Sequence, residues 1–185
     1  MNFFNHQHEN YYGNIGVYGN RGANFILQSA DRLLVLGSRL DNRQRGNVKK
    51  FAQNANVLVL DIDHGELDKH KNNPNHEMIQ IDFYSLHKVM DNLNVQINSC
   101  DSWSQYCNQI KEKYFTDWPS SSAVKYDSLN PYDVVKKINR LINDDAIVTV
   151  DDGANLCWVF QAFSRTNQTI YTAGGNSPMG YSFPA

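Results

Sequence analysis

The sequence predicts an α/β protein with a doubly wound, Rossmann-like parallel sheet, followed by the first part of a second α/β domain. Short continuous apolar runs, RLLVLG at 32–37 and VLVLDID at 57–63, alternate with segments whose apolar residues recur at helical spacing. The same alternation starts again after residue 131. Continuous runs of this kind are typical of parallel strands that are covered on both faces.

The first half of the chain opens with four glycines at intervals of three, in YYGNIGVYGNRGAN at 11–24. This spacing indicates a loop in which the backbone closely approaches another group. The elements predicted after it are, in order, a helix over 23–30, a strand over 32–37, a polar loop over 39–46, a short helix over 48–55, a strand over 57–63, a helical turn over 64–71, a strand over 78–82 and a helix from Tyr84. In such sheets ligands bind beyond the carboxyl ends of the strands, so Gly37, Asp61 and Asp82 mark the candidate ligand edge.

The second half is separated from the first by a helix and a connector. Trp103, Tyr106, Ile110 and Tyr114 recur at helical spacing, and TDWPSSSAVKYDSLNP after them places a domain boundary near residue 125. A helix is expected from Pro131, a strand in AIVTVDDG, a helix or turn in ANLCWVFQAF, and a strand in TIYT before a glycine-rich turn. The predicted domains are therefore 1–95, a helix and linker over 96–130, and 131–185.

Composition excludes several functional classes. A net charge of −2 and a pI near 6.3 argue against nucleic-acid or anionic-lipid partners. No apolar run reaches the roughly 18–20 residues of a spanning helix, and the polar start lacks the pattern of a signal peptide, so we expect a cytoplasmic protein. The three cysteines have no metal-ligand spacing and are expected to be reduced thiols, and no metal site is predicted.

Five segments together resemble the acetolactate (acetohydroxyacid) synthase family of thiamine-diphosphate enzymes. They are IGVYGNRGAN, DRLLVLGSRLDNRQRGNVKKFA, VLVLDIDHGEL, VDDGANLCW and GGNSPMGYSFPA, and they occur in the family's order and spacing. The resemblance implies that 1–95 is the central domain and 131–185 the opening part of the diphosphate-binding domain. It also implies that the glutamate that activates the cofactor and the magnesium motif lie outside this chain, which we therefore expect to be an inactive fragment.

The resemblance assigns residues to thiamine diphosphate. Met179 would support the bent cofactor, the Ser177 carbonyl would accept a hydrogen bond from its amino group, and Gly180 would keep the turn tight. Asp152, Gly153, Ala154 and Asn155 would surround the diphosphate. Ser177 replaces the family's glycine and Asp152 a neutral residue. Two alternatives stay open: Met179 as an ordinary core methionine, and Asp151 with Asp152 as magnesium ligands or as a carboxylate pair at a helix N-terminus.

The resemblance also points to FAD in the central domain of the parent enzyme. The matching positions are Gly19, Gly37, Ser38, Arg39, Asp41, Arg43, Asp61 and Asp82. Arg39 and Arg43 would pair with the flavin diphosphate. The alternative is that Arg39 and Asp41 are a structural pair within the loop.

The implied parent reaction is decarboxylation of pyruvate and its condensation to a 2-hydroxy-3-oxo acid, by a transferase or lyase that requires thiamine diphosphate and Mg²⁺. The partners would be a small 2-oxo acid substrate and further copies of the chain, in a dimer or tetramer. One alternative is a related thiamine-diphosphate lyase or hydrolase with another substrate. The other is a non-catalytic dinucleotide-binding module, although the glycines at 13–22 do not follow the G-x-G-x-x-G pattern.

Overall fold

A computed structural model describes residues 5–92, 100–115 and 129–185. The chain divides into two compact units: unit 1 contains Met1–Asn24 and Ile110–Ala185, and unit 2 contains Phe25–Gln109. The domain boundary predicted near residue 125 lies outside the described residues, so the predicted domain limits remain predictions.

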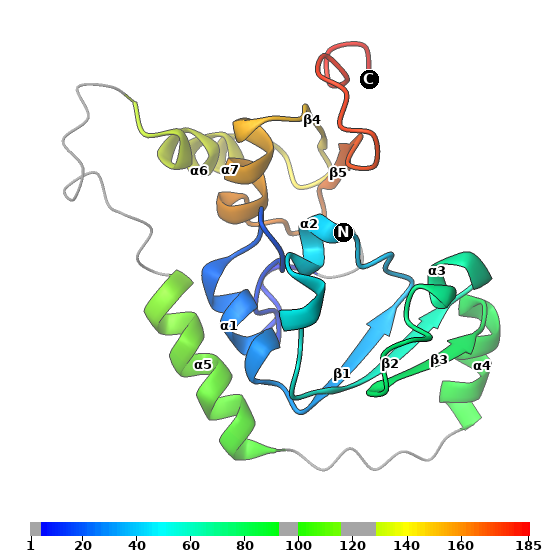
Figure 1. Cartoon of the computed structure of the whole chain (residues 1–185). Helices are drawn as coiled ribbons and strands as arrows, with labels where there is room; N and C mark the ends of the chain where they lie inside the picture. Colours follow the sequence, from blue (N-terminus) through cyan, green and yellow to red (C-terminus); the bar gives the residue numbers. More distant parts are fainter. Residues whose placement is uncertain (1–4, 93–99, 116–128) are drawn as a thin grey trace. The chain divides into compact units, whose positions relative to one another are not determined.

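Unit 2 is built on a parallel sheet of three strands in the order β1(Arg32–Leu36), β2(Asn56–Asp61), β3(His76–Gln80), which run side by side in Figure 1. The register pairs Leu34 with Leu58, and Leu58 with Glu77. Because all three strands are parallel, their carboxyl ends share one edge, as the sequence predicts. The third strand was expected over 78–82 and is observed at His76–Gln80, so it both begins and ends two residues earlier. Asp82 therefore lies after the strand.

The two faces of this sheet are covered to different extents. Val35, Val57 and Val59 are at most 6% exposed on one face, although Met78 on the same face is 37% exposed. On the other face Leu34 and Leu36 are 57% and 43% exposed, whereas Leu60 is 7% exposed. The expectation that the first strand is covered on both faces is therefore wrong for the described residues. An apolar run predicts that both faces of a strand are covered, but it does not say which part of the protein covers them.

Helices connect these strands. Those with residues in unit 2 are α1(Arg21–Ser29), α2(Asn42–Arg45), a single 3₁₀ turn Val48–Lys50, α3(His64–Asp68), α4(Phe83–Asn92) and α5(Asp101–Phe115), of which α1 and α5 also extend into unit 1. Two local predictions are wrong. The polar loop contains α2, because Asp41 and Gln44 form a capping box at its start. The helix predicted over 48–55 stops after one turn, because Phe51 adopts an extended conformation (φ −74°, ψ 122°), and Ala52 after it a left-handed one (φ 45°).

Unit 1 holds α6(Pro131–Leu141), β4(Ile147–Val150), α7(Ala154–Ala162) and β5(Thr169–Thr172). Pro131 begins α6, as predicted, and the side chain of Asn130 caps it. β4 and β5 are parallel neighbours, so the turns after them leave the same sheet edge. The core of the unit consists of Val135, Val150, Leu156, Phe163 and Ile170.

The glycine loop at 13–24 packs onto α7 in unit 1. Asn14 donates a hydrogen bond to the carbonyl of Phe160 (2.8 Å), and buried Asn20 donates to that of Gln161 (3.2 Å). A Cβ on Gly19 would lie 2.2 Å from the Asn14 carbonyl oxygen, so only glycine fits there. The close approach predicted from the glycine spacing is therefore one of the backbone to itself. In the described part of the chain, no helix is both long and apolar enough to cross a membrane.

Candidate functional site

The first candidate site residues lie in the β4–α7 turn, residues 151–155. Gly153 precedes α7 with φ 125°, a conformation that favours glycine, and no side chain caps the helix. The first amides of a helix have no partner within it, so this uncapped N-terminus presents backbone donors. Asn155 reaches back to the Asp151 carbonyl (3.0 Å), which fixes the turn. Burial, with a smaller contribution from Asp152, raises the pKa of the Cys157 thiol in the next helical turn.

The second group lies in the Met179 turn, residues 177–181, which follows β5. Ser177 has φ 50°, the conformation expected at a position where the resembling family has glycine. Its amide donates to the Ala173 carbonyl (3.0 Å). Met179 is 83% exposed, so the alternative of an ordinary core methionine is wrong in this structure. An exposed methionine at the tip of a tight turn is available to contact a ligand.

The Asp151 carboxylate joins these two turns. It accepts the Gly180 amide at 2.9 and 2.8 Å and the Tyr181 amide at 3.3 Å. Residues 151–155 and 177–181 are therefore neighbours, as the sequence predicts for strand-end turns of one sheet. Among the described residues no group of three or more His, Cys, Asp or Glu side chains is arranged to hold a metal ion.

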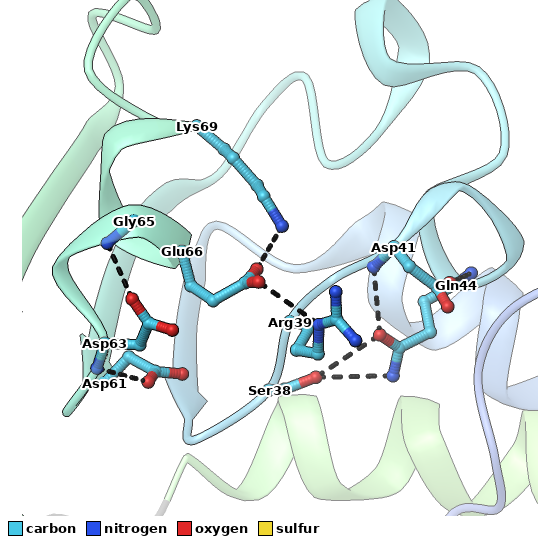
Figure 2. A network of polar contacts seen from close by, with 9 residues as sticks. All are labelled: Ser38, Arg39, Asp41, Gln44, Asp61, Asp63, Gly65, Glu66 and Lys69. Carbon is cyan, nitrogen blue, oxygen red and sulfur yellow. Dashed lines mark hydrogen bonds and ion pairs between the residues drawn. The ribbon is translucent and has the colours of Figure 1, made fainter. Parts of the chain in front are cut away.

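The candidate flavin residues in unit 2 begin with the loop after β1. Gly37 has φ 54°, and a Cβ there would lie 3.0 Å from the Phe83 ring. The Ser38 hydroxyl bonds the Gln44 side chain (Figure 2). The Arg39 side chain is 69% exposed, and its Nε lies 3.2 Å from Glu66, which also pairs with Lys69. The hydrogen bond from Lys69 is the main cause that lowers the pKa of Glu66.

The carboxylates at this edge each bond to nearby backbone. Asp41 accepts the amides of Arg43 and Gln44, both at 2.9 Å, and exposed Arg43 lies in the first turn of that helix. Asp61, 9% exposed, accepts the Asp63 amide (2.9 Å) (Figure 2). Asp82 accepts from the hydroxyl and amide of Ser85, which lowers its pKa.

These contacts revise the flavin site predicted from the sequence. Arg39 pairs with Glu66, and Asp41 caps α2, so the alternative of an Arg39–Asp41 pair does not describe the loop. Gly19 belongs to unit 1, where its carbonyl accepts from Gln161 (3.1 Å), while the other seven residues lie in unit 2. Within unit 2, the residues that follow β1 and β2 are linked by the contact from Arg39 to Glu66.

Two contributors were missed from the sequence. Glu66 was read only as part of a surface turn, and its pairing with Arg39 required knowledge of the strand order. Asp151 was considered only as a metal ligand or a helix-terminal carboxylate. Its position directly after a predicted strand, with a glycine-rich turn after the next strand, was the available signal for a contact between the two turns.

Comparison with known proteins shows what the first half of the chain is similar to. Residues 1–86 match the family described as the thiamine pyrophosphate enzyme central domain. The resemblance read from the sequence and the α/β fold class are thereby confirmed.

Beyond the central domain, similarity extends over most of the chain. It is 33% identical over 175 residues to the acetolactate synthase isozyme 1 large subunit of Escherichia coli K12, covering 94% of this chain and 30% of that protein. It is 32% identical over 180 residues to the acetolactate synthase large subunit of Lactococcus lactis, covering 96% and 30%. A probable acetolactate synthase large subunit of Methanococcus aeolicus is 27% identical, covering 94% of this chain and 31% of that protein. The chain thus spans about 30% of the length of these relatives.

Proposed function

We propose that the chain is part of a thiamine-diphosphate-dependent enzyme of the acetolactate synthase type, which decarboxylates pyruvate and condenses it to a 2-hydroxy-3-oxo acid. The observation that carries the proposal is the hydrogen bonding of the Met179 turn to Asp151 in the β4–α7 turn. The two segments that the resemblance assigns to opposite ends of one cofactor are thereby neighbours. Similarity to acetolactate synthase large subunits supports pyruvate as the substrate over those of related lyases and hydrolases.

The residues of the two turns fit thiamine diphosphate. The uncapped start of α7 offers the amides of Ala154 and Asn155 to phosphate oxygens, and Gly153 lets the backbone approach them. The exposed side chain of Met179 would support the bent cofactor by apolar contact. The Ser177 carbonyl would accept a hydrogen bond from the cofactor's amino group, and Gly180 would keep the turn tight. When bound, the cofactor would supply the carbanion and the electron sink that decarboxylation needs. The protein groups would bind the cofactor and orient it.

Asp152 is the member of the set that fits a bare diphosphate least well, because its carboxylate and the phosphates repel each other. A divalent cation removes this conflict, and Mg²⁺ usually binds through one or two carboxylates and the phosphates. We therefore include Mg²⁺ in the proposal for the parent enzyme, with its protein ligands outside the residues assigned here.

Flavin binding by the central domain is a second, separate proposal. It is supported by exposed Arg39 at the carboxyl edge of β1, two residues after Gly37. Within unit 2, Gly37, Ser38, Arg39, Asp41, Arg43, Asp61 and Asp82 would form the surface. We further propose a cytoplasmic homo-oligomer, a dimer or tetramer, that acts on small 2-oxo acids as a transferase or lyase.

Calorimetric titration of the chain tests the main proposal. Thiamine diphosphate with Mg²⁺ is expected to give a saturable heat that Gly153→Ala abolishes, because alanine is strained at φ 125° and its Cβ would lie 3.1 Å from Asn155 Oδ1. Gly174→Ala is the matched control, since a Cβ there meets nothing closer than 4.0 Å. FAD is titrated in parallel. Binding of NAD without binding of thiamine diphosphate would favour the dinucleotide module instead.

The same preparation tests the expectation that the chain alone is inactive. With about 30% of the length of its relatives, it should form no acetolactate from pyruvate with thiamine diphosphate, Mg²⁺ and FAD present. Turnover that depends on the chain would contradict this expectation.

A further inference from the structure

The Asp151 carboxylate receives more backbone donors than a strand-end aspartate needs for its own turn. The amides of Asp152, Gly180 and Tyr181 all point at it, at 2.9, 2.8 and 3.3 Å to the nearer oxygen. The Gly180 amide lies within 2.9 Å of both carboxylate oxygens. Hydrogen bonds from neutral donors to a carboxylate are roughly twice as strong as those between neutral groups.

The segment that these bonds hold has few other restraints. Met179 and Phe183 are 83% and 97% exposed, so apolar packing does not fix them. Ser177 and Gly180 both have positive φ, a backbone path that few residues adopt without support. A second anchor lies just beyond, where the Thr149 hydroxyl donates to the Ser182 carbonyl (3.1 Å). Both anchors belong to β4 or the residue that follows it.

We infer that Asp151 is a positioning residue, whose carboxylate fixes the Met179 turn against the end of β4 and so sets where Met179 meets the cofactor. The inference rests on the proposed function and adds a residue that is not among its assigned cofactor contacts. It also separates the roles of two adjacent carboxylates. Asp151 faces the backbone of the turn, and Asp152 remains the carboxylate beside the proposed diphosphate position.

A metal-ligand role for Asp151 makes a different prediction. In the described part of the chain Asp151 belongs to no group of three or more potential metal ligands, and its carboxylate faces the backbone amides of Asp152, Gly180 and Tyr181. Replacing a ligand would change the Mg²⁺ concentration needed for cofactor binding. Replacing a positioning residue would change the exchange of the amides it holds, with or without any metal.

The first experiment is amide hydrogen exchange on the 185-residue chain, resolved by NMR. Asp151→Asn keeps the shape but puts an NH₂ group against backbone donors. We expect exchange at Gly180 and Tyr181 to become at least tenfold faster, while Val148 and Ile170 in the strands keep their rates. Asp145→Asn, an exposed carboxylate before the same strand, is the matched control and should change neither pair. Unchanged exchange at Gly180, or equal acceleration in the strands, would overturn the inference.

The second experiment titrates thiamine diphosphate into the same variants at several Mg²⁺ concentrations. For Asp151→Asn we expect about tenfold weaker cofactor binding with an unchanged Mg²⁺ dependence, and wild-type behaviour for Asp145→Asn. Wild-type affinity in Asp151→Asn, or a shifted Mg²⁺ dependence, would overturn the positioning role. If the wild-type chain does not bind the cofactor, the proposed function fails, and the exchange rates still decide whether Asp151 holds the turn.

Discussion

Ser177 is one of three described non-glycine residues, with Leu40 and Ala52, whose positive φ is unfavourable for a residue with a side chain. It has φ 50°, a conformation that costs a residue with a Cβ roughly 1–2 kcal/mol. Glycine removes that cost but gives the unfolded chain more freedom, worth about 0.4–1 kcal/mol. We expect Ser177→Gly to raise the free energy of unfolding by up to about 1 kcal/mol, measured by urea denaturation. Asn176→Gly, whose backbone is not left-handed, should lower it instead. A loss in both variants would contradict the strain at Ser177.

A histidine pair gives unit 2 a defined response to pH. His70 is 2% exposed, and its Nδ1 lies 2.8 Å from Nδ1 of His76, so one shared proton is favourable and two are not. Burial lowers the pKa of both rings below 6.5. The positive charge of Arg45 lowers both further, that of Lys69 lowers His70, and Glu66 opposes this at His70.

Because the folded pKa values lie below the unfolded ones, the unfolded state binds more protons as the pH falls. The stabilisation is fully present above pH 6.5 and is lost as the pH falls through the folded values. Amide exchange of α3 and β3, corrected for intrinsic rates, should therefore show declining protection below that pH. His76→Asn should flatten this dependence. His87→Gln, which changes an exposed ring paired with Asp91, should leave it unchanged, and a pH response that persists in His76→Asn would contradict the role of the pair.

At the residue scale, the sequence predicted where side chains lie in the fold better than it predicted which groups they bond. Asp61 and Asp82 lie at the carboxyl edge of the sheet as expected, yet their oxygens accept amides of residues that follow them. A strand-end position can be read from a one-dimensional pattern, but a hydrogen bond depends on the turn geometry. Asp151 is a second example, because its carboxylate oxygens accept the amide of Gly180, which lies 29 residues further along the chain.

At the element scale, the glycine loop at 13–24 depends on one close backbone contact. Gly19→Ala would place a Cβ 2.2 Å from the Asn14 carbonyl oxygen, and backbone cannot move aside as a flexible side chain can. We expect a loss of about 3 kcal/mol in the free energy of unfolding, at the upper end of overpacking costs. Gly175→Ala has nothing within 4 Å and should change stability by less than about 0.5 kcal/mol. Equal effects of the two substitutions in thermal or urea unfolding would contradict this account of the loop.

The elements differ in how well the sequence predicted their bounds and their burial. α6 was predicted from Pro131 onward because its start signal and apolar stripe are both local. The helix expected over 48–55 ended after Lys50, because Phe51 is extended and Ala52 left-handed, and neither residue type signals that change. The β1 run predicted a strand correctly but not its exposure, because Leu34 and Leu36 face away from the buried side of the sheet.

At the scale of the whole molecule, that exposed sheet face predicts self-association. Leu34, Leu36 and Ile79 lie on one face by strand alternation and register, and they are 57%, 43% and 48% exposed. Leu60 lies between Leu36 and Ile79 in the register and is only 7% exposed, so the exposed side chains flank a covered one. Exposed apolar side chains that share a face tend to be covered by another protein surface. We expect sedimentation velocity to show a weight-average mass that rises with concentration.

Leu34→Lys should reduce this association, because a charged side chain opposes burial of the face, while the fold should tolerate it at a position already 57% exposed. Leu141→Lys is the matched control: it makes the same chemical change at a residue of unit 1 that is 70% exposed and not part of the sheet. If the association used exposed apolar side chains in general, both variants would weaken it alike. If the association uses the β1–β2–β3 face, only Leu34→Lys will weaken it. A wild-type chain that stays monomeric at high concentration would contradict the predicted self-association itself.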